Sequence, residues 1–196
     1  MTSPSVSDRN RAAIIYATEG FRWGLGPLKR QIADLVRFVE TSDDPCVNSP
    51  KHYLLNNLLF AVGQMDTARS HTFLARLLRE SPSHTVRSDA LDGMAFEKKR
   101  FDVDLVLPFA SEHRHRSEIL SALYALEFRD CVRKRSEDVR ERLIPLLRYD
   151  HPMVRAYAIG VLRGRAENFD LILPFRDDPS ALVRESVEEP VRYWDM

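Results

Sequence analysis

The sequence predicts an all-α fold, in the form of a short α-α superhelix of about five helical hairpins. Apolar residues recur three and four positions apart along almost the whole chain, and this spacing is typical of amphipathic helices rather than strands. The hexapeptide DLVLPF at residues 104–109 recurs 66 positions later as DLILPF at residues 170–175, which corresponds to two repeats of about 33 residues. A Val-Arg pair also follows a polar, proline-containing turn at residues 86–87, 154–155 and 183–184.

The N-terminal segment is expected to cap the array. A polar start and Gly20 can bound a first helix, because glycine accepts the left-handed backbone conformation that ends helices. A glycine-rich loop that contains the aromatic residues Phe21 and Trp23 follows. We therefore expect a capping helix and loop in residues 1–26, then a repeat array in residues 27–196, with a single domain overall.

The array is expected to consist of successive helical hairpins, each with two apolar stripes separated by a polar or proline-containing turn. The expected hairpins cover residues 28–62, 74–94, 105–126, 143–162 and 171–191. Pro108, Pro145 and Pro174 fall inside the first helices of three hairpins. A proline ring lacks the backbone amide and crowds the preceding turn. We expect these residues to bend their helices without ending them.

The clearest copy of the repeat is similar to a known family. Residues 143–162 follow the pattern Leu-x-x-Leu-Leu-x-x-Asp-x-Pro-x-Val-Arg-x-x-Ala-x-x-Val-Leu, which resembles the short HEAT repeat of phycobilisome-lyase-like proteins. The resemblance implies hairpins that stack side by side, because one hairpin alone cannot bury both of its apolar stripes. It implies little about function, since the motif encodes packing between hairpins.

Three arginines occupy the second position of the Val-Arg pairs, namely Arg87, Arg155 and Arg184. They could form a ladder that binds a ligand. The resemblance implies a different role, in which each arginine bridges the turn between the two helices and neighbouring acidic groups. Asp150 and either Asp177 or Asp178 are suitably placed for this, and a guanidinium group can donate several hydrogen bonds at once.

Two segments are candidate partner-binding sites near the N-terminus. Phe21 and Trp23 could present aromatic anchors to a partner, because such rings dominate interface energetics, or they could plug the open end of the array. Asp43 and Asp44 lie in an acidic insertion. The insertion could meet a basic partner or simply be a solvated turn.

The segment Glu112-His113-Arg114-His115-Arg116 is the third candidate site. Two imidazoles and a carboxylate suggest metal binding, but zinc needs a third or fourth ligand in defined geometry and none is near in sequence. The alternatives are a solvated turn and a contact with an acidic partner. We expect no metal and no cofactor.

The composition argues against several classes of protein. The chain has 29 basic and 29 acidic residues and therefore a formal net charge of zero, which disfavours strong binding to nucleic acid. No apolar stretch approaches the roughly 20 residues of a membrane span. Cys46 and Cys131 are isolated, as expected for reduced thiols. We expect a cytoplasmic protein without a membrane partner.

The sequence contains no recognisable phosphate loop, nucleophile elbow or zinc-protease motif. The leading hypothesis is a non-enzymatic protein-binding module, such as a bacterial immunity protein that neutralises a cognate toxin, or an adaptor. One alternative, from resemblance to HEAT-like alkylpurine DNA glycosylases, is a DNA-binding enzyme. Another, suggested by the repeat subtype, is a bilin-lyase-like protein that handles tetrapyrroles.

Overall fold

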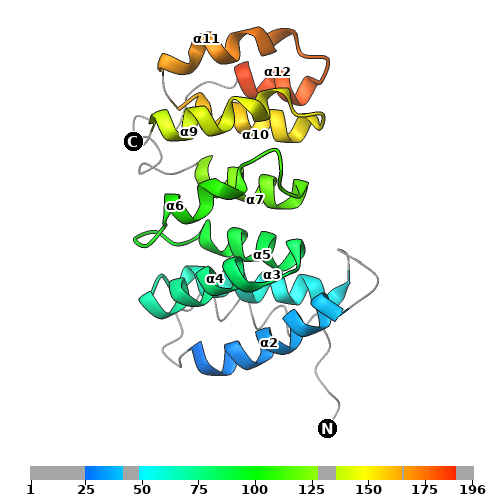
Figure 1. Ribbon diagram of the computed structural model, residues 1–196, viewed down its shortest axis with the longest axis vertical. Helices are drawn as coiled ribbons and strands as arrows, with labels where there is room; N and C mark the ends of the chain where they lie inside the picture. Colours follow the sequence, from blue (N-terminus) through cyan, green and yellow to red (C-terminus); the bar gives the residue numbers. More distant parts are fainter. Residues whose placement is uncertain (1–24, 42–48, 128–135, 165, 189–196) are drawn as a thin grey trace. The chain divides into compact units, whose positions relative to one another are not determined.

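The computed structural model describes residues 25–41, 49–127, 136–164 and 166–188, and these ranges contain helices and no strand (Figure 1). Phe21, Trp23, Asp43 and Asp44 lie outside the described residues, as does nearly all of the expected N-terminal cap. The chain divides into two compact units, Met1–Asp102 and Val103–Met196, and each is described by itself below. The expected division into a cap and one repeat array stays a prediction.

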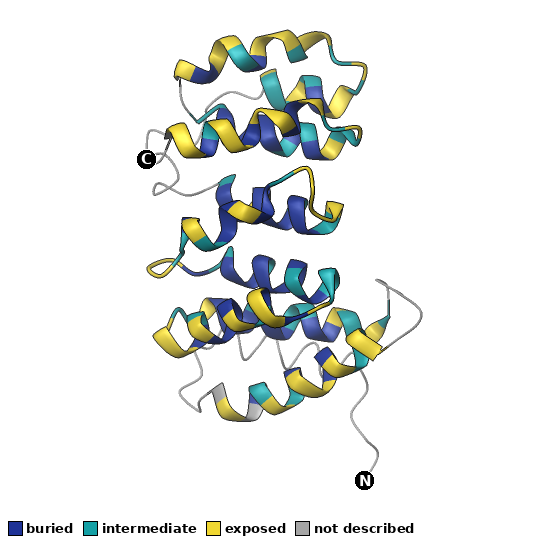
Figure 2. Cartoon of the chain, in the orientation of Figure 1, coloured by how far each residue is buried: buried dark blue, intermediate teal, exposed yellow. Residues whose placement is uncertain are grey.

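Unit 1 contains two helical hairpins. Helix α2 (Leu25–Thr41) pairs with α3 (Pro50–Gln64), and α4 (Ala68–Glu80) pairs with α5 (His84–Met94). The second helices, α3 and α5, also pack against each other. The sides of the helices that face their neighbours are buried (Figure 2). The fully buried large side chains of this unit are Ile32, Leu55, Leu59, Leu74, Leu78, Leu91 and Met94.

Side-chain caps define where the helices of unit 1 begin. Ser49 accepts a hydrogen bond from the backbone amide of His52, and Ser83 accepts one from that of Val86. Thr67 and Ser70 form a capping box at the start of α4. These hydroxyls satisfy amides that have no partner within the helix, so the short polar turns of the sequence mark the boundaries of the helices.

The two second helices of unit 1 approach each other closely at a pair of glycines. A Cβ atom added to Gly63 of α3 would clash with the carbonyl oxygen of Gly93 of α5. A Cβ atom added to Gly93 would lie 2.7 Å from the carbonyl oxygen of Leu59. Both glycines are therefore required by packing between backbones.

Unit 2 contains three hairpins, and the first helix of each has two parts. Each first helix begins as an α-helix and continues as a 3₁₀ helix: α6 (Val103–Val106) with η1 (Leu107–Phe109), α9 (Ser136–Leu143) with η2 (Pro145–Arg148), and α11 (Phe169–Ile172) with η4 (Leu173–Asp177). A further 3₁₀ turn, η3 (Ala166–Asn168), precedes α11. The second helices are α7 (Arg116–Glu127), α10 (Pro152–Leu162) and α12 (Ala181–Glu188), and α10 packs against both of the others.

The prediction that three prolines bend continuous helices is wrong. Each α-helix ends two residues before Pro108, Pro145 or Pro174, and a 3₁₀ helix contains the proline. The proline nitrogen cannot donate to the carbonyl four residues earlier, and its ring clashes with that carbonyl. The tighter 3₁₀ winding continues the chain direction with a different hydrogen-bond pattern.

The described residues thus form five helical hairpins, and the predicted all-α helical-repeat fold is confirmed. The hairpins lie where the sequence repeats place them. None of the helices in the described ranges combines the length and apolar character that crossing a membrane requires.

Candidate functional site

The three signature arginines hold the turns of their hairpins. Each Nη1 atom donates to the carbonyl oxygen of the residue six positions earlier, which belongs to the turn before the second helix. The acceptors are Ser81 for Arg87 at 2.6 Å, Tyr149 for Arg155 at 2.9 Å and Asp178 for Arg184 at 2.7 Å. In the last two hairpins Nη1 also reaches the carbonyl five positions earlier, at Asp150 and Pro179. The arginines are thus engaged by backbone within their own hairpins.

Asp178 links the last two hairpins of unit 2. Its carboxylate accepts hydrogen bonds from Nε and Nη2 of Arg155 at 3.0 and 2.8 Å, and from the backbone amide of Ser180 at 2.8 Å. The hydrogen bond from Arg155 holds the pKa of Asp178 below its ordinary value of 3.8, against the opposing effect of burial. Asp150, the other acidic residue expected to contact Arg155, accepts a hydrogen bond from Arg155 through its backbone carbonyl.

The candidate segment at residues 112–116 forms the turn between η1 and α7. The Nδ1 atom of His115 lies 3.3 Å from the backbone amide of Ser117 and 2.9 Å from its hydroxyl oxygen. The His115 amide donates to the Glu118 carboxylate at 3.2 Å. His115 therefore caps α7, as His151 caps α10 by accepting a hydrogen bond from the Met153 amide.

The other members of this segment are exposed. His113 lies 3.8 Å from the Glu112 carboxylate, and the guanidinium carbon of Arg114 lies 4.5 Å from the centre of the Phe109 ring. Arg116 is the first residue of α7. Within the described ranges there is no group of three or more His, Cys, Asp or Glu residues that could hold a metal ion.

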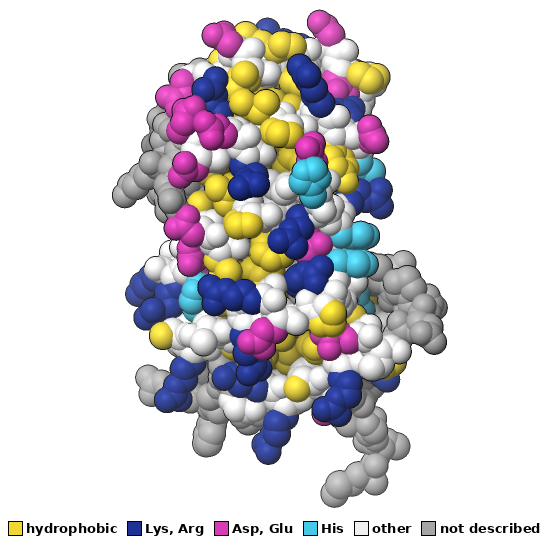
Figure 3. Space-filling view, in the orientation of Figure 1, with side chains coloured by type: hydrophobic (Ala, Val, Ile, Leu, Met, Phe, Trp, Pro, Cys, Tyr) yellow, Lys and Arg dark blue, Asp and Glu magenta, His cyan; other side chains and the backbone are white. Residues whose placement is uncertain are grey.

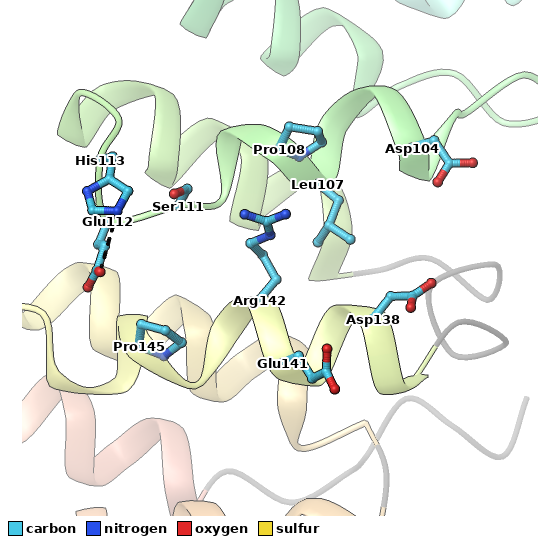
Figure 4. A pocket seen from close by; sticks show the side chains of 10 residues that line it. All are labelled: Asp104, Leu107, Pro108, Ser111, Glu112, His113, Asp138, Glu141, Arg142 and Pro145. Carbon is cyan, nitrogen blue, oxygen red and sulfur yellow. Dashed lines mark ion pairs between the residues drawn. The ribbon is translucent and has the colours of Figure 1, made fainter.

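A groove lies beside this turn, entirely within unit 2. It has a volume of about 560 Å³ and runs between the first helices of two successive hairpins (Figure 4). One side comes from α6, η1 and the turn, and the other from α9 and η2. The lining residues are Asp104, Leu107, Pro108, Ser111, Glu112, His113, Asp138, Glu141, Arg142 and Pro145. The Arg142 side chain extends from α9 between the two sides.

The groove combines acidic edges with an apolar floor. Four of its lining residues are carboxylates, whereas Arg142 is its single arginine and His113 already faces Glu112. Leu107, Pro108 and Pro145 supply apolar surface. Such a mixture is typical of surfaces that bind peptide segments, where apolar contacts give affinity and charges give register.

The same pattern recurs along the first helices of unit 2. An acidic residue precedes each proline by four positions, and an apolar residue precedes it by one. The three sets are Asp104, Leu107 and Pro108; Glu141, Ile144 and Pro145; Asp170, Leu173 and Pro174. Ile144 and Leu173 are 39% and 37% exposed. We call these sets rungs. On this face of unit 2 hydrophobic side chains form a band with acidic side chains along one edge (Figure 3).

The sequence prediction missed the groove, although the signal was present. The recurrence of DLVLPF predicts the architecture of the hairpins through its apolar residues, and it does not by itself indicate that the acidic and proline positions share a surface. A comparison of the repeats by exposed rather than buried positions would have found it. The predicted site residues His113 and Glu112 do lie at its rim.

Unit 1 contains a separate polar cluster between α3 and α5. Asp89 is buried, and its carboxylate oxygens lie 3.0 and 3.2 Å from Nε2 of His52. The side-chain amide of Asn56 donates to Asp89 at 3.0 Å and to Asp92 at 3.3 Å. These contacts cross from one second helix to the next, so the cluster contributes to the packing of the two hairpins.

Comparison with known proteins leaves the family open. No protein-family profile matches the sequence, and no curated protein matches it significantly. Membership of a HEAT-repeat family therefore stays a prediction, which rests on the motif at residues 143–162.

Proposed function

We propose that this chain is a non-enzymatic protein-binding module, and that it binds its partner on the first-helix face of unit 2. The observation that supports this most directly is the row of exposed prolines Pro108, Pro145 and Pro174, which the exposed Ile144 and Leu173 join on the second and third rungs, with a groove between the first two rungs. Exposed apolar side chains that repeat in register across neighbouring helices are typical of an interaction surface.

The roles of the conspicuous polar residues also favour binding over catalysis. Arg155 and Arg184 tie inter-helix turns, and His115 caps a helix. These side chains serve the fold, whereas the groove carries the mixture of charge and apolar surface that a protein partner recognises.

A toxin-neutralising or adaptor role is the more specific form of this proposal. It implies a cognate partner encoded near this gene. Co-expression with the neighbouring gene product tests it, because an immunity protein forms a complex with its toxin and relieves its toxicity. A well-folded chain that neither binds the neighbour nor alters its toxicity would contradict the immunity role.

Site-specific photo-crosslinking tests the binding surface itself. A photoreactive amino acid is placed at Ile144 or Leu173 on the first-helix face, and at Met153 or Leu182 on second helices as controls of similar exposure. We expect a discrete protein adduct from the first pair in the native cell. Adducts only from the control pair would place the partner on the other face, and no adduct from either pair would contradict the proposed function.

A further inference from the structure

We propose that the groove of unit 2 binds an arginine-bearing segment of the partner protein, and that the arginine side chain enters between the first helices of the first two hairpins of this unit. This inference rests on the proposed function, since it specifies what the partner places on the first-helix face. The site is confined to the groove between α6 with η1 and α9 with η2.

The groove has room for a side chain from outside. Its volume of about 560 Å³ lies within the range of about 300–1,000 Å³ that is usual for ligand pockets. The Arg142 side chain extends from α9 between the two sides (Figure 4). Among the described residues, no hydrogen bond or ion pair joins Arg142 to a carboxylate of the groove. The groove therefore combines open space with carboxylates that its own arginine does not pair with.

The charges that line the groove favour a cation. Carboxylates come from both sides, namely Asp104 and Glu112 from α6 and the turn, and Asp138 and Glu141 from α9. One arginine and one histidine stand against these four groups. Asp104 and Asp138 already interact with other groups. We therefore expect the exposed Glu112 and Glu141 to bind the ligand. Glu112 contacts His113 through Oε1, and a carboxylate can accept hydrogen bonds at both of its oxygens.

The shape and hydration of a guanidinium group favour arginine over lysine. The exposed rings of Pro108 and Pro145 line the groove. The methylene groups of an arginine side chain can lie along such apolar surface while its charged end reaches a carboxylate. A guanidinium group is more weakly hydrated than an ammonium group, and it can donate two hydrogen bonds to one carboxylate. An arginine therefore loses less hydration than a lysine when it enters the groove.

Arg142 determines the sign of one expected effect. Its positive charge opposes the entry of a second guanidinium group, since like charges repel. Arg142→Gln removes this charge and should therefore tighten the binding of an arginine ligand about two- to fivefold. A ligand held through an acidic group would show the opposite effect, because Arg142 would be its partner.

The test uses the isotope-labelled full-length chain and three capped pentapeptides. Each peptide has alanine at the four outer positions, and its central residue is arginine, lysine or citrulline, which has nearly the shape of arginine without its charge. NMR titration follows the backbone amide signals of the chain. We expect the arginine peptide to shift the signals of Glu112 and Glu141 in a saturable way, and to bind at least about threefold more tightly than the lysine peptide. The citrulline peptide should cause no saturable shift, and added salt should weaken arginine binding.

Charge reversals locate the binding. Glu112→Lys and Glu141→Lys change the two sides of the groove, and each should weaken binding of the arginine peptide at least about fivefold. Glu185→Lys makes the same change on an exposed residue of the second helix α12 and should leave binding unchanged. Circular dichroism checks that the variants fold; if a groove variant does not fold, Glu112→Gln or Glu141→Gln takes its place.

The outcomes separate this inference from the proposed function. Equal binding of the arginine and citrulline peptides, or weaker arginine binding by Arg142→Gln, would overturn the positive charge of the ligand. Equal binding of the arginine and lysine peptides would overturn the choice of arginine, and equal effects of Glu141→Lys and Glu185→Lys would overturn the location. Absence of peptide binding, together with partner crosslinks at Ile144 and Leu173, would refute the ligand chemistry and leave the protein-binding function standing. Absence of crosslinks would instead remove the function itself.

Discussion

At the scale of single residues, the repeat signature acts through the backbone. Arg87, Arg155 and Arg184 donate to carbonyl groups of the turn that precedes their helix. A turn between antiparallel helices leaves carbonyl groups without helical partners, and a guanidinium group can serve two of them at once. The arginine thus fixes the angle at which the chain enters the second helix, and Asp178 extends the same contact to the next hairpin.

The Arg155–Asp178 pair predicts an acid-dependent loss of stability. Because the folded pKa of Asp178 lies below its ordinary value of 3.8, its stabilising contribution is complete above that value and is lost as the pH falls through the lowered folded pKa. Asp178→Asn removes the charge but keeps an oxygen for the Ser180 amide. The difference in free energy of unfolding between wild type and variant should be constant from about pH 7 to 5 and should shrink below about pH 4.

Urea denaturation at each pH measures this difference. Asp177→Asn provides the control, because Asp177 is an exposed neighbouring carboxylate and its loss should have a small effect at every pH. A wild type to Asp178→Asn difference that stays constant down to pH 2 would show that the Arg155 contact does not depend on the charge of Asp178.

The histidine cap of α10 gives a second prediction. His151→Ala removes the acceptor for the Met153 amide and should lower the free energy of unfolding by about 1 kcal/mol. His151→Asp supplies a better acceptor at the same position and should restore the loss. Urea denaturation at pH 7 measures both variants, and equal destabilisation by Ala and Asp would mean that His151 contributes through its ring contacts rather than through the cap.

At the scale of elements, two features determine the structure of the hairpins: close backbone contacts between helices, and the prolines that interrupt the first helices. Gly63 and Gly93 let α3 and α5 touch through their backbones. The α-helices end before Pro108, Pro145 and Pro174, and a 3₁₀ helix contains each proline. At two of the three junctions the apolar residue before the proline is exposed, Ile144 and Leu173, whereas Leu107 at the first junction is buried. The interruption of the first helix thus coincides with exposed apolar surface in the last two hairpins.

Substitution of a contact glycine tests the backbone packing. Gly93→Ala places a methyl group 2.7 Å from the Leu59 carbonyl oxygen, which the two helices can relieve only by moving apart. We expect a loss of about 1–3 kcal/mol in the free energy of unfolding. Gly26→Ala in α2 is the matched control, because among the described residues no atom beyond its chain neighbours and the nearby backbone of α2 lies within 4 Å of the added methyl group.

The control should behave in the opposite way. Alanine has a higher helix propensity than glycine, so Gly26→Ala should raise stability by about 0.5–1 kcal/mol. Thermal and urea unfolding of both variants measure the effects. If Gly93→Ala were as stable as wild type, the close approach of α3 and α5 would not be required by the fold.

At the scale of the whole molecule, the charge is balanced overall and locally acidic at the groove, and we therefore predict weak binding to nucleic acid. The chain carries 29 basic and 29 acidic residues. Its described groove is lined by four carboxylates and one arginine, so the local field there would repel phosphates.

This balance predicts that the chain does not retard duplex DNA in a gel, even at low salt, where phosphate contacts are strongest. A basic helical-repeat protein serves as the positive control. Retardation that disappears with added salt would contradict the prediction and revive the DNA-binding alternative, and an absorbance change on titration with a linear tetrapyrrole would do the same for the bilin-related alternative.

The sequence by itself determined the fold class and the register of the hairpins. Apolar spacing of three and four residues depends on helix geometry alone, and repeats reveal stacking because each hairpin needs a neighbour to bury its second stripe. The resemblance of residues 143–162 to HEAT repeats implied a structural role for Arg155 and left its acidic partner open between neighbouring residues, and the structure shows that Asp178 accepts its hydrogen bonds.

Tertiary structure alone decided which exposed residues act together. Glu141 and Pro108 are far apart in sequence and line one groove because their hairpins stack, and Asp89 meets His52 across two helices. The tertiary structure also decided that prolines end helices here, and that His115 caps a helix. The apolar pattern of a single sequence indicates which residues can be buried. A binding surface depends instead on which exposed residues lie side by side. Their proximity is set by the distances between hairpins, and no local sequence pattern contains those distances.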